Sequence, residues 1–488
     1  MKNSNLTIWF TSSRAFNIQL KVSCVLLFLC CLYSCGQQES LDFSKEWLLK
    51  DEIVASITEP SFPDRIYSII DWGAIGDGRT MNTNAFMRAI QKCAEEGGGK
   101  VLVPSGKYLT APIHLESNVN LYLEKGAEIL FSKDHGDYPL VNTSYEGTEL
   151  INFSPLIYAK GKSNIAITGE GVLNGQAGIE NWWPWCGKDT YGWKKGQPKQ
   201  HSSLEKLKNH MSVKGVPVDE RVFGEGEYLR PTFIEPFECE NVLIRGVTII
   251  NAPFWSIHPF RSNNVIVDGV TISSHGPNND GCNPEYSKNV LIKNCTFNTG
   301  DDCIAIKSGR NEDGRRVNIK SENIVIQNCK MIDGHGGVVM GSEISAGVKN
   351  VFVENCEMNS PNLDRAIRIK SNTKRGGFVE NVFVRNLKVG QVREAVLKIN
   401  LFYGIYGAQK GDYMPEVKNI VLENVQAENG GKYGILIQGY DEKPIERVVL
   451  KDVIIQKADS SYSMKGITHV NFINTFINGQ LMNNSINN

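Results

Sequence analysis

The sequence lacks several features that would assign it to common classes of protein. Its 12 cysteines include no C-x-x-C pair, which argues against a zinc site. Its 52 basic and 53 acidic residues provide no excess of positive charge for a nucleic acid partner. The first 35 residues contain no Asp or Glu, and their apolar segment 22–34 is too short to cross a membrane as a helix. We therefore expect a protein that binds no nucleic acid and needs no metal or other cofactor.

The first 35 residues have the pattern of a secretory signal. Three cations, Lys2, Arg14 and Lys21, precede the apolar segment, which ends in the string LYSC at residues 32–35. This string resembles a bacterial lipobox, and the resemblance implies that Cys35 is lipidated and becomes the mature N-terminus. The expected location is then the bacterial cell envelope, with the protein exported and held on a membrane by its lipid. The alternative is a signal cleaved elsewhere, with Cys35 lost.

Most of the remaining chain is built from one repeated unit. Each copy begins with Asn, continues with alternating apolar residues and a polar pair, and ends in a second short alternating run. The strong copies start 23, 25, 34, 27 and 31 residues apart. This period, with two or three short strands per repeat, predicts a β-solenoid and excludes helical repeats, because the apolar residues alternate with period two. The strong copies begin at Asn241, Asn264, Asn289, Asn323, Asn350 and Asn381, and weaker copies begin at Asn164, Asn419 and Arg447.

Two kinds of side chain recur in phase and are expected to stack from coil to coil. The leading Asn of each copy is predicted to form a side-chain ladder. Cys295, Cys329 and Cys356 each lie six residues after their Asn. We interpret these cysteines as small buried apolar residues that stack inside the solenoid, with disulfides as the alternative.

The ends of a solenoid expose unpaired strands and need covering. Residues 83–96 predict an amphipathic helix that caps the N-terminal end. Residues 176–230 interrupt the repeat with four tryptophans and a charged stretch, which predicts a long loop insertion. The expected organisation is a signal at 1–35, a linker and N-terminal extension at 36–65, and one all-β domain at 66–488.

Polar side chains recur at the same stage of four consecutive repeats, in the strand that follows each Asn-led unit. Stacked coils lie about 4.8 Å apart, so these side chains should form a stripe on one face. Each string alone is typical of a solvated turn or a charged edge. Three acids, an imidazole and two cations in register instead predict a site that combines proton transfer with anion binding. The stripe contains Asp280, Asp301, Asp302, His335, Arg368 and Lys370.

These residues resemble the four motifs of glycoside hydrolase family 28, the polygalacturonase family. The motifs N-x-D, G-D-D, G-H-G and R-x-K occur in this order at residues 278–280, 300–302, 334–336 and 368–370. The resemblance extends from about Ile70 to about Gly439, and it implies a right-handed parallel β-helix. The family often has an acid three residues after the N-x-D aspartate, where this sequence has Asn283, and this departure leaves the fine specificity open.

The resemblance implies an inverting hydrolysis of α-galacturonosyl linkages in pectin, which needs a carboxylic acid and a carboxylate base. Asp301 is then the general acid, and Asp280 and Asp302 hold and activate the water. Like charges favour one of the three carboxyls remaining protonated. His335 is expected to tune Asp301 or to bind sugar. The remaining residues assigned to substrate binding are Arg368, Lys370, Asn278, His258 and Tyr403.

The insertion at 176–230 leads us to expect exo-action, since it could close one end of a groove that is otherwise open. The four tryptophans of the insertion, Trp182, Trp183, Trp185 and Trp193, would either form a small core of this wall or stack on sugar. The alternatives are a rhamnogalacturonan or xylogalacturonan hydrolase, a pectate lyase that uses calcium, or a non-catalytic glycan-binding surface protein. The expected partners are a pectic polysaccharide or oligogalacturonide and, through Cys35, a membrane.

Overall fold

The structure is a computed structural model that describes residues 41–404, 410–482 and 486–487. The chain divides into two units, Met1–Leu49 and Lys50–Asn488, and each is described by itself. Cys35 lies outside the described residues. No helix among the described residues is long and apolar enough to span a membrane.

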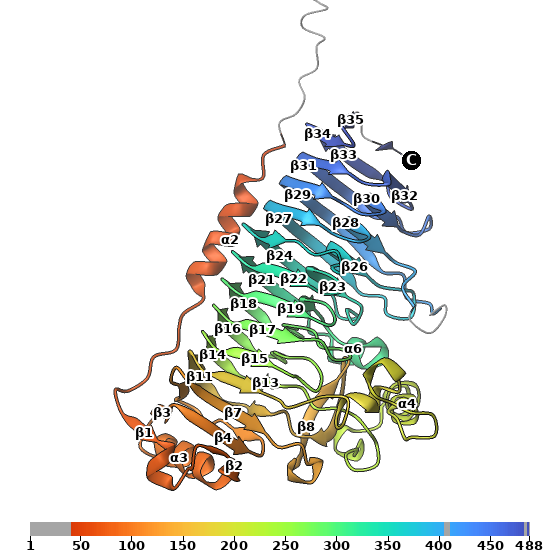
Figure 1. The fold of residues 1–488 in the computed structure, drawn as a ribbon. Coiled ribbons are helices and arrows are strands. Elements are labelled where there is room, and N and C mark those ends of the chain that lie inside the picture. The colour runs from red at the N-terminus through yellow and green to blue at the C-terminus, as the bar shows by residue number, and fades with distance from the viewer. Residues whose placement is uncertain (1–40, 405–409, 483–485, 488) are drawn as a thin grey trace, which may run out of the picture. The chain divides into compact units, whose positions relative to one another are not determined.

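Lys50–Asn488 forms a right-handed parallel β-helix, as predicted, with strands stacked coil on coil (Figure 1). The repeats supply strands to three stacks, and these strands pair in parallel with the equivalent strands of the next coil. In the third stack, the coils at Ile257 and Cys282 contribute isolated bridges in place of strands. The register is continuous, because Ile167 pairs with Ile244, Ile244 with Val267, and Val267 with Ile292. Equivalent residues of successive repeats therefore lie directly above one another.

The strands of the three stacks have the following bounds. The first stack contains β1 (Ile66–Ser68), β3 (Gly99–Val103), β6 (Val119–Leu123), β11 (Ser163–Gly169), β14 (Glu240–Arg245), β16 (Asn263–Asp268), β18 (Lys288–Lys293), β21 (Ser321–Gln327), β24 (Val348–Glu354), β27 (Phe378–Gln391), β29 (Glu416–Asn429), β31 (Glu446–Lys457) and β33 (His469–Ile473). The second contains β2 (Asp77–Met81), β4 (Gly106–Thr110), β7 (Ala127–Phe131), β12 (Val172–Asn174), β15 (Thr248–Ile250), β17 (Thr271–Ser274), β19 (Thr296–Thr299), β22 (Lys330–Asp333), β25 (Glu357–Met358) and β34 (Thr475–Ile477), with the second halves of β27, β29 and β31. The third, here called the site stack, contains β5 (Ile113–His114), β10 (Ile157–Lys160), β13 (Ile234–Phe237), β20 (Ile304–Ile306), β23 (Val338–Gly341), β26 (Arg365–Lys370), β28 (Ala395–Asn400), β30 (Tyr433–Gln438) and β32 (Ser460–Lys465).

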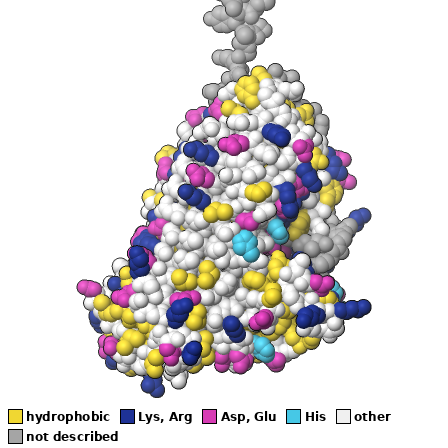
Figure 2. Space-filling model, in the orientation of Figure 1, with side chains coloured by type: hydrophobic (Ala, Val, Ile, Leu, Met, Phe, Trp, Pro, Cys, Tyr) yellow, Lys and Arg dark blue, Asp and Glu magenta, His cyan; other side chains and the backbone are white. Residues whose placement is uncertain are grey.

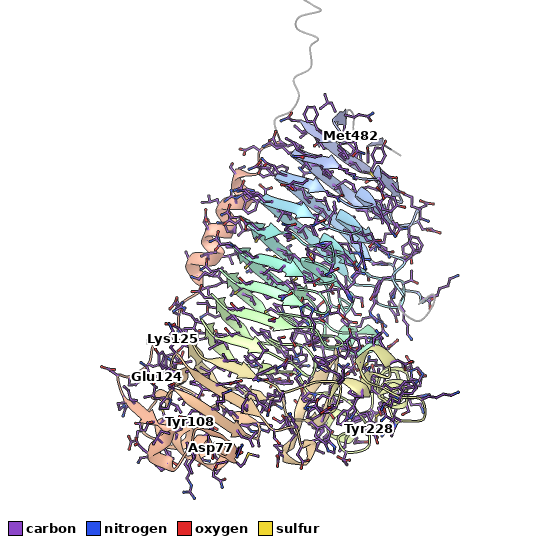
Figure 3. All side chains as sticks on the ribbon, in the orientation of Figure 1. Asp77, Tyr108, Glu124, Lys125, Tyr228 and Met482 are labelled. Atoms are coloured by element: carbon purple, nitrogen blue, oxygen red, sulfur yellow. The ribbon has the colours of Figure 1, made fainter. Side chains whose placement is uncertain are left out.

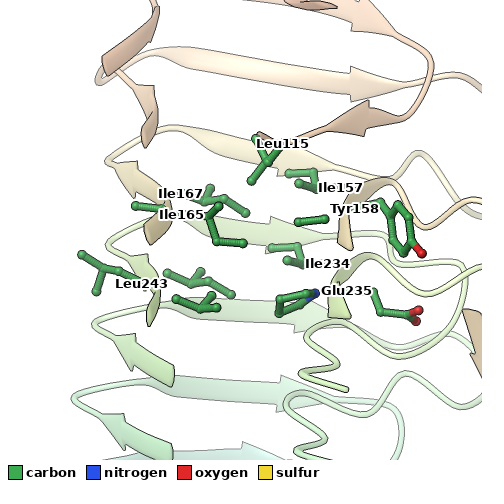
Figure 4. A pocket seen from close by; sticks show the side chains of 13 residues that line it. Leu115, Ile157, Tyr158, Ile165, Ile167, Ile234, Glu235 and Leu243 are labelled. Carbon is green, nitrogen blue, oxygen red and sulfur yellow. The ribbon is translucent and has the colours of Figure 1, made fainter. Parts of the chain in front are cut away.

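The interior of the solenoid is filled by alternate side chains of these strands. In Figure 4, Ile157 and Ile234 point inward, whereas Tyr158 and Glu235 on the next positions point away from the interior. The space between the inward side chains is a dry void of about 10 Å³, which is too small to hold a ligand. The three stacked cysteines Cys295, Cys329 and Cys356 are all buried and unbridged, as expected.

The leading asparagines form the predicted ladder. Asn323 Nδ2 donates to Asn289 Oδ1 at 2.9 Å, and Asn350 Nδ2 donates to Asn323 Oδ1 at 3.1 Å. Each of these residues has a left-handed backbone, with φ of 54° at Asn289, 59° at Asn323 and 56° at Asn350. Asn tolerates this conformation better than other residues with a side chain, because its short amide makes local hydrogen bonds. The same residue thus turns the corner of each coil and links it to the next.

The N-terminal end of the solenoid is capped as predicted by a helix, α3 (Thr83–Glu95), which buries Phe86, Ile90 and Cys93. The extension at 36–65 is not only a linker, because it contains the helix α2 (Ser44–Ser56), which the sequence analysis did not predict. After α2 the chain bonds to the first stack, where Thr58 N donates to Asn264 Oδ1 at 3.1 Å. At the other end, β35 (Gln480–Met482) pairs antiparallel with β34, and β36 (Ile486–Asn487) pairs antiparallel with β33.

Two segments leave the solenoid beside the site stack. One is the predicted insertion, which contains the short helices η3 (Trp183–Cys186), η4 (Asp189–Tyr191), α4 (His201–Glu205), η5 (Lys206–Met211), α5 (Ser212–Lys214) and η6 (Val218–Glu220). The other is an unpredicted antiparallel hairpin of β8 (Leu140–Tyr145) and β9 (Thr148–Phe153). Figure 3 shows Tyr228 in this region, away from Met482 at the far end of the solenoid. A third short excursion forms α6 (Asn311–Val317), and η1 (Ile69–Trp72) and η2 (His135–Asp137) complete the helical turns.

The asparagine ladder predicts a specific pattern of stability. Asn323→Ala should destabilise the protein by about 2–4 kcal/mol, because it removes ladder hydrogen bonds and leaves alanine in a left-handed backbone. Asn323→Gly loses the same hydrogen bonds without the backbone strain, and should cost about 1 kcal/mol less. Denaturant unfolding of the two variants measures both contributions. Equal stability of the alanine variant and wild type would show that the ladder contributes nothing.

Candidate active site

The predicted stripe lies on the outer face of the site stack, on four consecutive coils. The acids at 301 and 302 come directly before β20, and His335 comes before β23. Arg368 and Lys370 are alternate residues of β26, so both point outward. The structure therefore brings together all six residues of the stripe, Asp280, Asp301, Asp302, His335, Arg368 and Lys370.

Asp302 is buried, with 1 % of its surface exposed, but it is not isolated. Lys370 Nζ donates to Asp302 Oδ2 at 2.6 Å, and Arg368 Nη1 lies 3.5 Å from Asp302 Oδ1. Both cations belong to the second coil after that of Asp302, and their charges offset the cost of removing this carboxylate from water. The side chains of both adjacent acids therefore lie on the outer face of the site stack, and that of Asp302 is covered there by these cations.

Asp301 is the more accessible acid and is paired with His335. Its Oδ1 lies 3.0 Å from His335 Nδ1 and also accepts a hydrogen bond from the backbone N–H of Asp302 at 3.0 Å. Burial raises the pKa of Asp301, but the hydrogen bond with His335 and nearby lysines outweigh it and hold this pKa well below its usual range. The hydrogen bond to Asp301 in turn raises the pKa of His335 above its usual 6.5. In the free protein the pair therefore holds its proton mainly on the imidazole.

Asp280 lies one coil away from the adjacent acids and is also buried, with 4 % exposed. Burial and the negative charge of Asp301 raise its pKa well above the usual 3.8, and Lys307 opposes this shift. Lys307 Nζ lies 3.6 Å from Asp280 Oδ2, and Asn283 Nδ2 donates to the same oxygen at 2.9 Å. Asn283, where the family often has an acid, therefore acts as a neutral donor to Asp280. The carboxyl with the raised pKa is Asp280, and not the predicted general acid.

A pocket of about 380 Å³ opens above Asp301. Its lining includes Asp301, His335, Arg368, Lys370 and, as predicted, Asn278 and Tyr403. The Tyr403 ring centre lies 5.4 Å from the guanidinium carbon of Arg368 and 5.3 Å from Lys370 Nζ. Figure 2 shows charges of both signs interspersed on the face in view, whereas this pocket is lined by seven Lys and Arg side chains and four Asp and Glu side chains. The pocket therefore favours an anion.

The insertion forms one wall of this pocket. It contributes five lining residues, Cys186, Lys188, Gln200, Leu204 and Lys208. Its own small core joins the insertion to the hairpin, because Leu207 packs in one cluster with Tyr145, Leu150 and Phe254. Buried ion pairs hold the wall in place, including Arg221 with Asp313 of α6. The wall is thus a packed part of the protein beside the catalytic stripe.

Three tryptophans of the insertion pack on the main core of the solenoid. Trp182 is buried and packs against Trp185 with ring centres 4.8 Å apart. Trp183 donates from Nε1 to the carbonyl of Ala252 at 3.0 Å. Trp193 is the exception, because it lies at the surface and donates to the carbonyl of Gln197. The expected small core of the wall is therefore wrong for the first three, because they pack with the core of the solenoid and not in a core of the insertion.

The prediction that His258 binds substrate is wrong. His258 is completely buried, with Nδ1 3.1 Å from Glu235 Oε2 and Nε2 2.9 Å from Glu285 Oε2. Burial lowers the pKa of His258, but the hydrogen bonds to the two glutamates outweigh it and raise this pKa to about 9. The side chain of His258 points outward from the site stack. The hairpin covers it on that face, where Thr143 Oγ1 of the hairpin donates to Glu235 Oε1 at 2.6 Å. His258 is a buried cation between two carboxylates.

Sequence reasoning missed several residues of the site. Lys307 was hidden in the apolar string after the adjacent acids, although it lies on an alternate position of its strand and so faces outward. Lys208 and Glu146 belong to segments outside the repeat, where no register could place them. Arg310, Glu343 and Arg375 follow strands of the site stack and also line the pocket. No group of three or more His, Cys, Asp or Glu that could hold a metal ion occurs in the described part of the chain.

A parallel β-helix with paired carboxylic acids in a polar pocket on its outer face defines a class of glycoside hydrolases. The family profile described as "Glycosyl hydrolases family 28" matches residues 224–475, and the chain belongs to this family. It is therefore a glycoside hydrolase.

Several relatives support this assignment. A probable polygalacturonase of Vitis vinifera is 30% identical over 408 residues, which cover 80% of this chain and 74% of the relative. An exo-poly-alpha-D-galacturonosidase of Dickeya chrysanthemi is 28% identical over 421 residues, covering 81% and 67%. The crystal structure of an exopolygalacturonase from Thermotoga maritima is 44% identical, with a TM-score of 0.83, and the match covers 88% of this chain and 96% of that one.

Proposed function

We propose that this enzyme hydrolyses α-galacturonosyl linkages of pectin by an inverting mechanism and acts from the non-reducing chain end. The observation that carries the proposal is the pocket, which places carboxylic acids beside an excess of cations. A neutral sugar would have no use for these cations, whereas each residue of polygalacturonate bears a carboxylate. The names of the relatives support the same substrate.

Asp301 is assigned as the general acid. Its Oδ1 is held by His335 and by the backbone N–H of Asp302, while Oδ2 accepts no hydrogen bond from a described residue and is left for the leaving oxygen. In the free protein the proton of the pair lies mainly on His335. Substrate that covers the pair would exclude water, and a drier site disfavours the charge-separated form, so the proton shifts toward Asp301. His335 is thus a positioning residue that stores the proton.

Asp280 and Asp302 are assigned to the water. Inverting enzymes hold a water between base and sugar, and the base must be ionised to accept its proton. The carboxylate of Asp302 contacts two cations, Lys370 and Arg368. Asp280 depends on Lys307, because burial and the negative charge of Asp301 would otherwise favour the protonated form. Lys307 therefore supports catalysis by limiting the rise in the pKa of Asp280.

Arg368, Lys370 and Tyr403 are assigned to the sugar beside the scissile bond. The two cations are shared with Asp302, so the pocket side of each cation remains for a substrate carboxylate. Tyr403 presents a ring at the mouth of the same region, and Asn278 is fixed by Arg230, whose Nη2 donates to its Oδ1 at 2.8 Å. These contacts would orient one galacturonosyl residue against Asp301.

The exo-action rests on the wall formed by the insertion. A groove open at both ends accepts the interior of a polymer, whereas a pocket closed on one side admits a chain terminus. Five side chains of the insertion line the pocket, and its core is packed against the hairpin. The exo-acting relatives support this proposal.

The location is a separate proposal. The lipobox-like string at 32–35 supports a lipid on Cys35 and a position on a membrane of the bacterial cell envelope. The solenoid begins at Ile66, so about 30 residues would separate the anchor from the first strand.

The acid assignment predicts the effect of Asp301→Asn. The variant should lose about 10²–10⁴-fold in kcat on trigalacturonate, because no proton reaches the leaving oxygen.

The pH profile of wild type tests the same assignment. Activity should decrease at pH values below the raised pKa of Asp280, which exceeds 3.8, because the base is then protonated. It should also fall as pH rises through the pKa of His335, which exceeds 6.5, as the acid pair loses its proton. The alkaline loss should be missing from the residual activity of the variant. Asp268→Asn, outside the pocket, is the matched control, and near-wild-type turnover by Asp301→Asn would refute the assignment.

Exo-action predicts a slow fall in viscosity. With polygalacturonate, the number of reducing ends should rise well before viscosity drops, and galacturonic acid should be the first product. Viscometry combined with a reducing-end assay and chromatography of products measures this. A rapid loss of viscosity at few cleavages would show internal cutting and would rule out a closed pocket end.

The lipid anchor predicts the mass of the mature protein. The N-terminal peptide from the native host should begin at Cys35 and carry acyl groups, and Cys35→Ala should be released from the membrane with unchanged activity. Mass spectrometry of this peptide is the measurement. An unmodified N-terminus beyond Gly36 would exclude the anchor.

A further inference from the structure

A second group of charged side chains, some buried and some half-buried, lines the pocket beside Asp301. We call it the wall cluster, and it consists of Glu146, Lys208, Arg310, Glu343 and Arg375. Each member comes from a different segment, since Glu146 is the turn of the hairpin, Lys208 belongs to η5, and the others follow strands of the site stack. All five line the pocket.

The contacts within the wall cluster are close. Lys208 Nζ donates to Glu146 Oε2, which also lies 3.2 Å from Arg310 Nη1. Arg310 Nη1 lies 3.3 Å from Glu343 Oε1, and Arg375 Nη2 lies 3.7 Å from the same oxygen. The cluster therefore bridges the insertion and the solenoid across the pocket.

The cluster has more positive than negative charge. Three cations share two carboxylates, and Glu343 is further shared with Lys307, whose Nζ lies 3.4 Å from Glu343 Oε2. Lys208 and Arg375 have 6 % and 4 % of their surface exposed. A buried cation without its full complement of acceptors is costly unless another anion joins it.

Two further observations favour the binding of an anion by this cluster. The Nε atoms of Arg310 and Arg375 are buried and have no hydrogen-bond partner among the described residues. Burial and the charge of Arg310 lower the pKa of Lys208 to about 8, and the same two causes lower the pKa of Arg375 to about 9. Cations that oppose one another in this way are stabilised by a carboxylate placed among them.

We propose that Lys208, Arg310 and Arg375 form a second carboxylate site, which binds the carboxylate of the terminal galacturonosyl residue. The inference rests on the proposed function and makes it more specific. Arg368 and Lys370 then serve the residue on the other side of the scissile bond. The enzyme thus recognises two carboxylates of the substrate, and it cleaves chains whose terminal residue is a uronate.

The position of Lys208 explains why a second site would lie here. It is carried by the insertion, whereas Arg368 and Lys370 are carried by the solenoid. The terminal residue of the substrate is the part that meets the wall. Recognition of the terminal carboxylate is therefore built into the same segment that closes the pocket.

The test compares two trimers that differ only at the non-reducing terminal residue. One is trigalacturonate, and in the other that terminal residue is galactosyl, so a hydroxymethyl group replaces the carboxylate. Wild type should cleave trigalacturonate with a kcat/KM at least about tenfold higher, as expected for a charge-assisted contact. Lys208→Met should lose most of this preference, and Lys208→Arg, which keeps the charge, should restore it.

Lys206→Met is the matched control, since Lys206 lies in the same helix but pairs with Glu227 and does not line the pocket. It should keep the wild-type preference. Should Lys208→Met not fold, calorimetric binding of galacturonate and of galactose to the Asp301→Asn protein gives a second measurement, and galacturonate should bind at least about tenfold more tightly.

The outcomes separate the two proposals. If wild type cleaves both trimers equally well, the second carboxylate site is wrong and the proposed hydrolysis stands. A preference that survives unchanged in Lys208→Met would overturn the role of the cluster in the same way. If wild type cleaves neither trimer, the proposed function fails, and the second site fails with it.

Discussion

The stacking of one coil on the next in strict register is the constraint on which the rest of this structure depends. Parallel strands about 4.8 Å apart place every outward side chain directly beside its equivalents in the neighbouring coils. On the site stack, Asp302 is joined by Lys370 from the second coil along, and Asp280 is joined by Lys307 from the next coil. A catalytic stripe of three carboxylic acids is stable in such an array only because cations lie beside the buried acids.

The same array determines how protons are distributed. Burial favours protonation of Asp280 and of Asp301, and the neighbours of each carboxyl decide the outcome. Asp301 has an imidazole and stays ionised in the free protein, whereas the lysine near Asp280 lies 3.6 Å away and does not fully offset burial. The acid and base assignments therefore depend on side chains outside the carboxylates themselves, and one of these, Lys307, belongs to none of the four motifs.

The fold and the stripe could be predicted because both are consequences of periodicity. The Asn that starts each repeat fixes the register, and the register places Asp280, Asp302 and Lys370 on the same face of neighbouring coils. The wall of the pocket has no such period. Lys208 and Glu146 are 62 residues apart in sequence, and Arg310 and Glu146 are 164 apart, so their contacts follow from packing that no local pattern encodes. The prediction for His258 was wrong for a different reason. Its register places it on the outer face of the site stack, but the hairpin, which the sequence analysis did not predict, covers that face.

The insertion leaves the solenoid after β12 and returns at β13, and the strands on both sides of it keep their register. Val172 still pairs with Thr248, and Ile157 pairs with Ile234, although more than 50 residues of chain lie between the two coils. Closing a longer loop costs only about 0.6 kcal/mol for each doubling of its length. The chain can therefore lengthen, shorten or exchange this excursion at little cost to folding, while the acids on the coils beneath stay in place. Evolution could in this way change which end of a polymer the enzyme accepts without altering the chemistry that cleaves it.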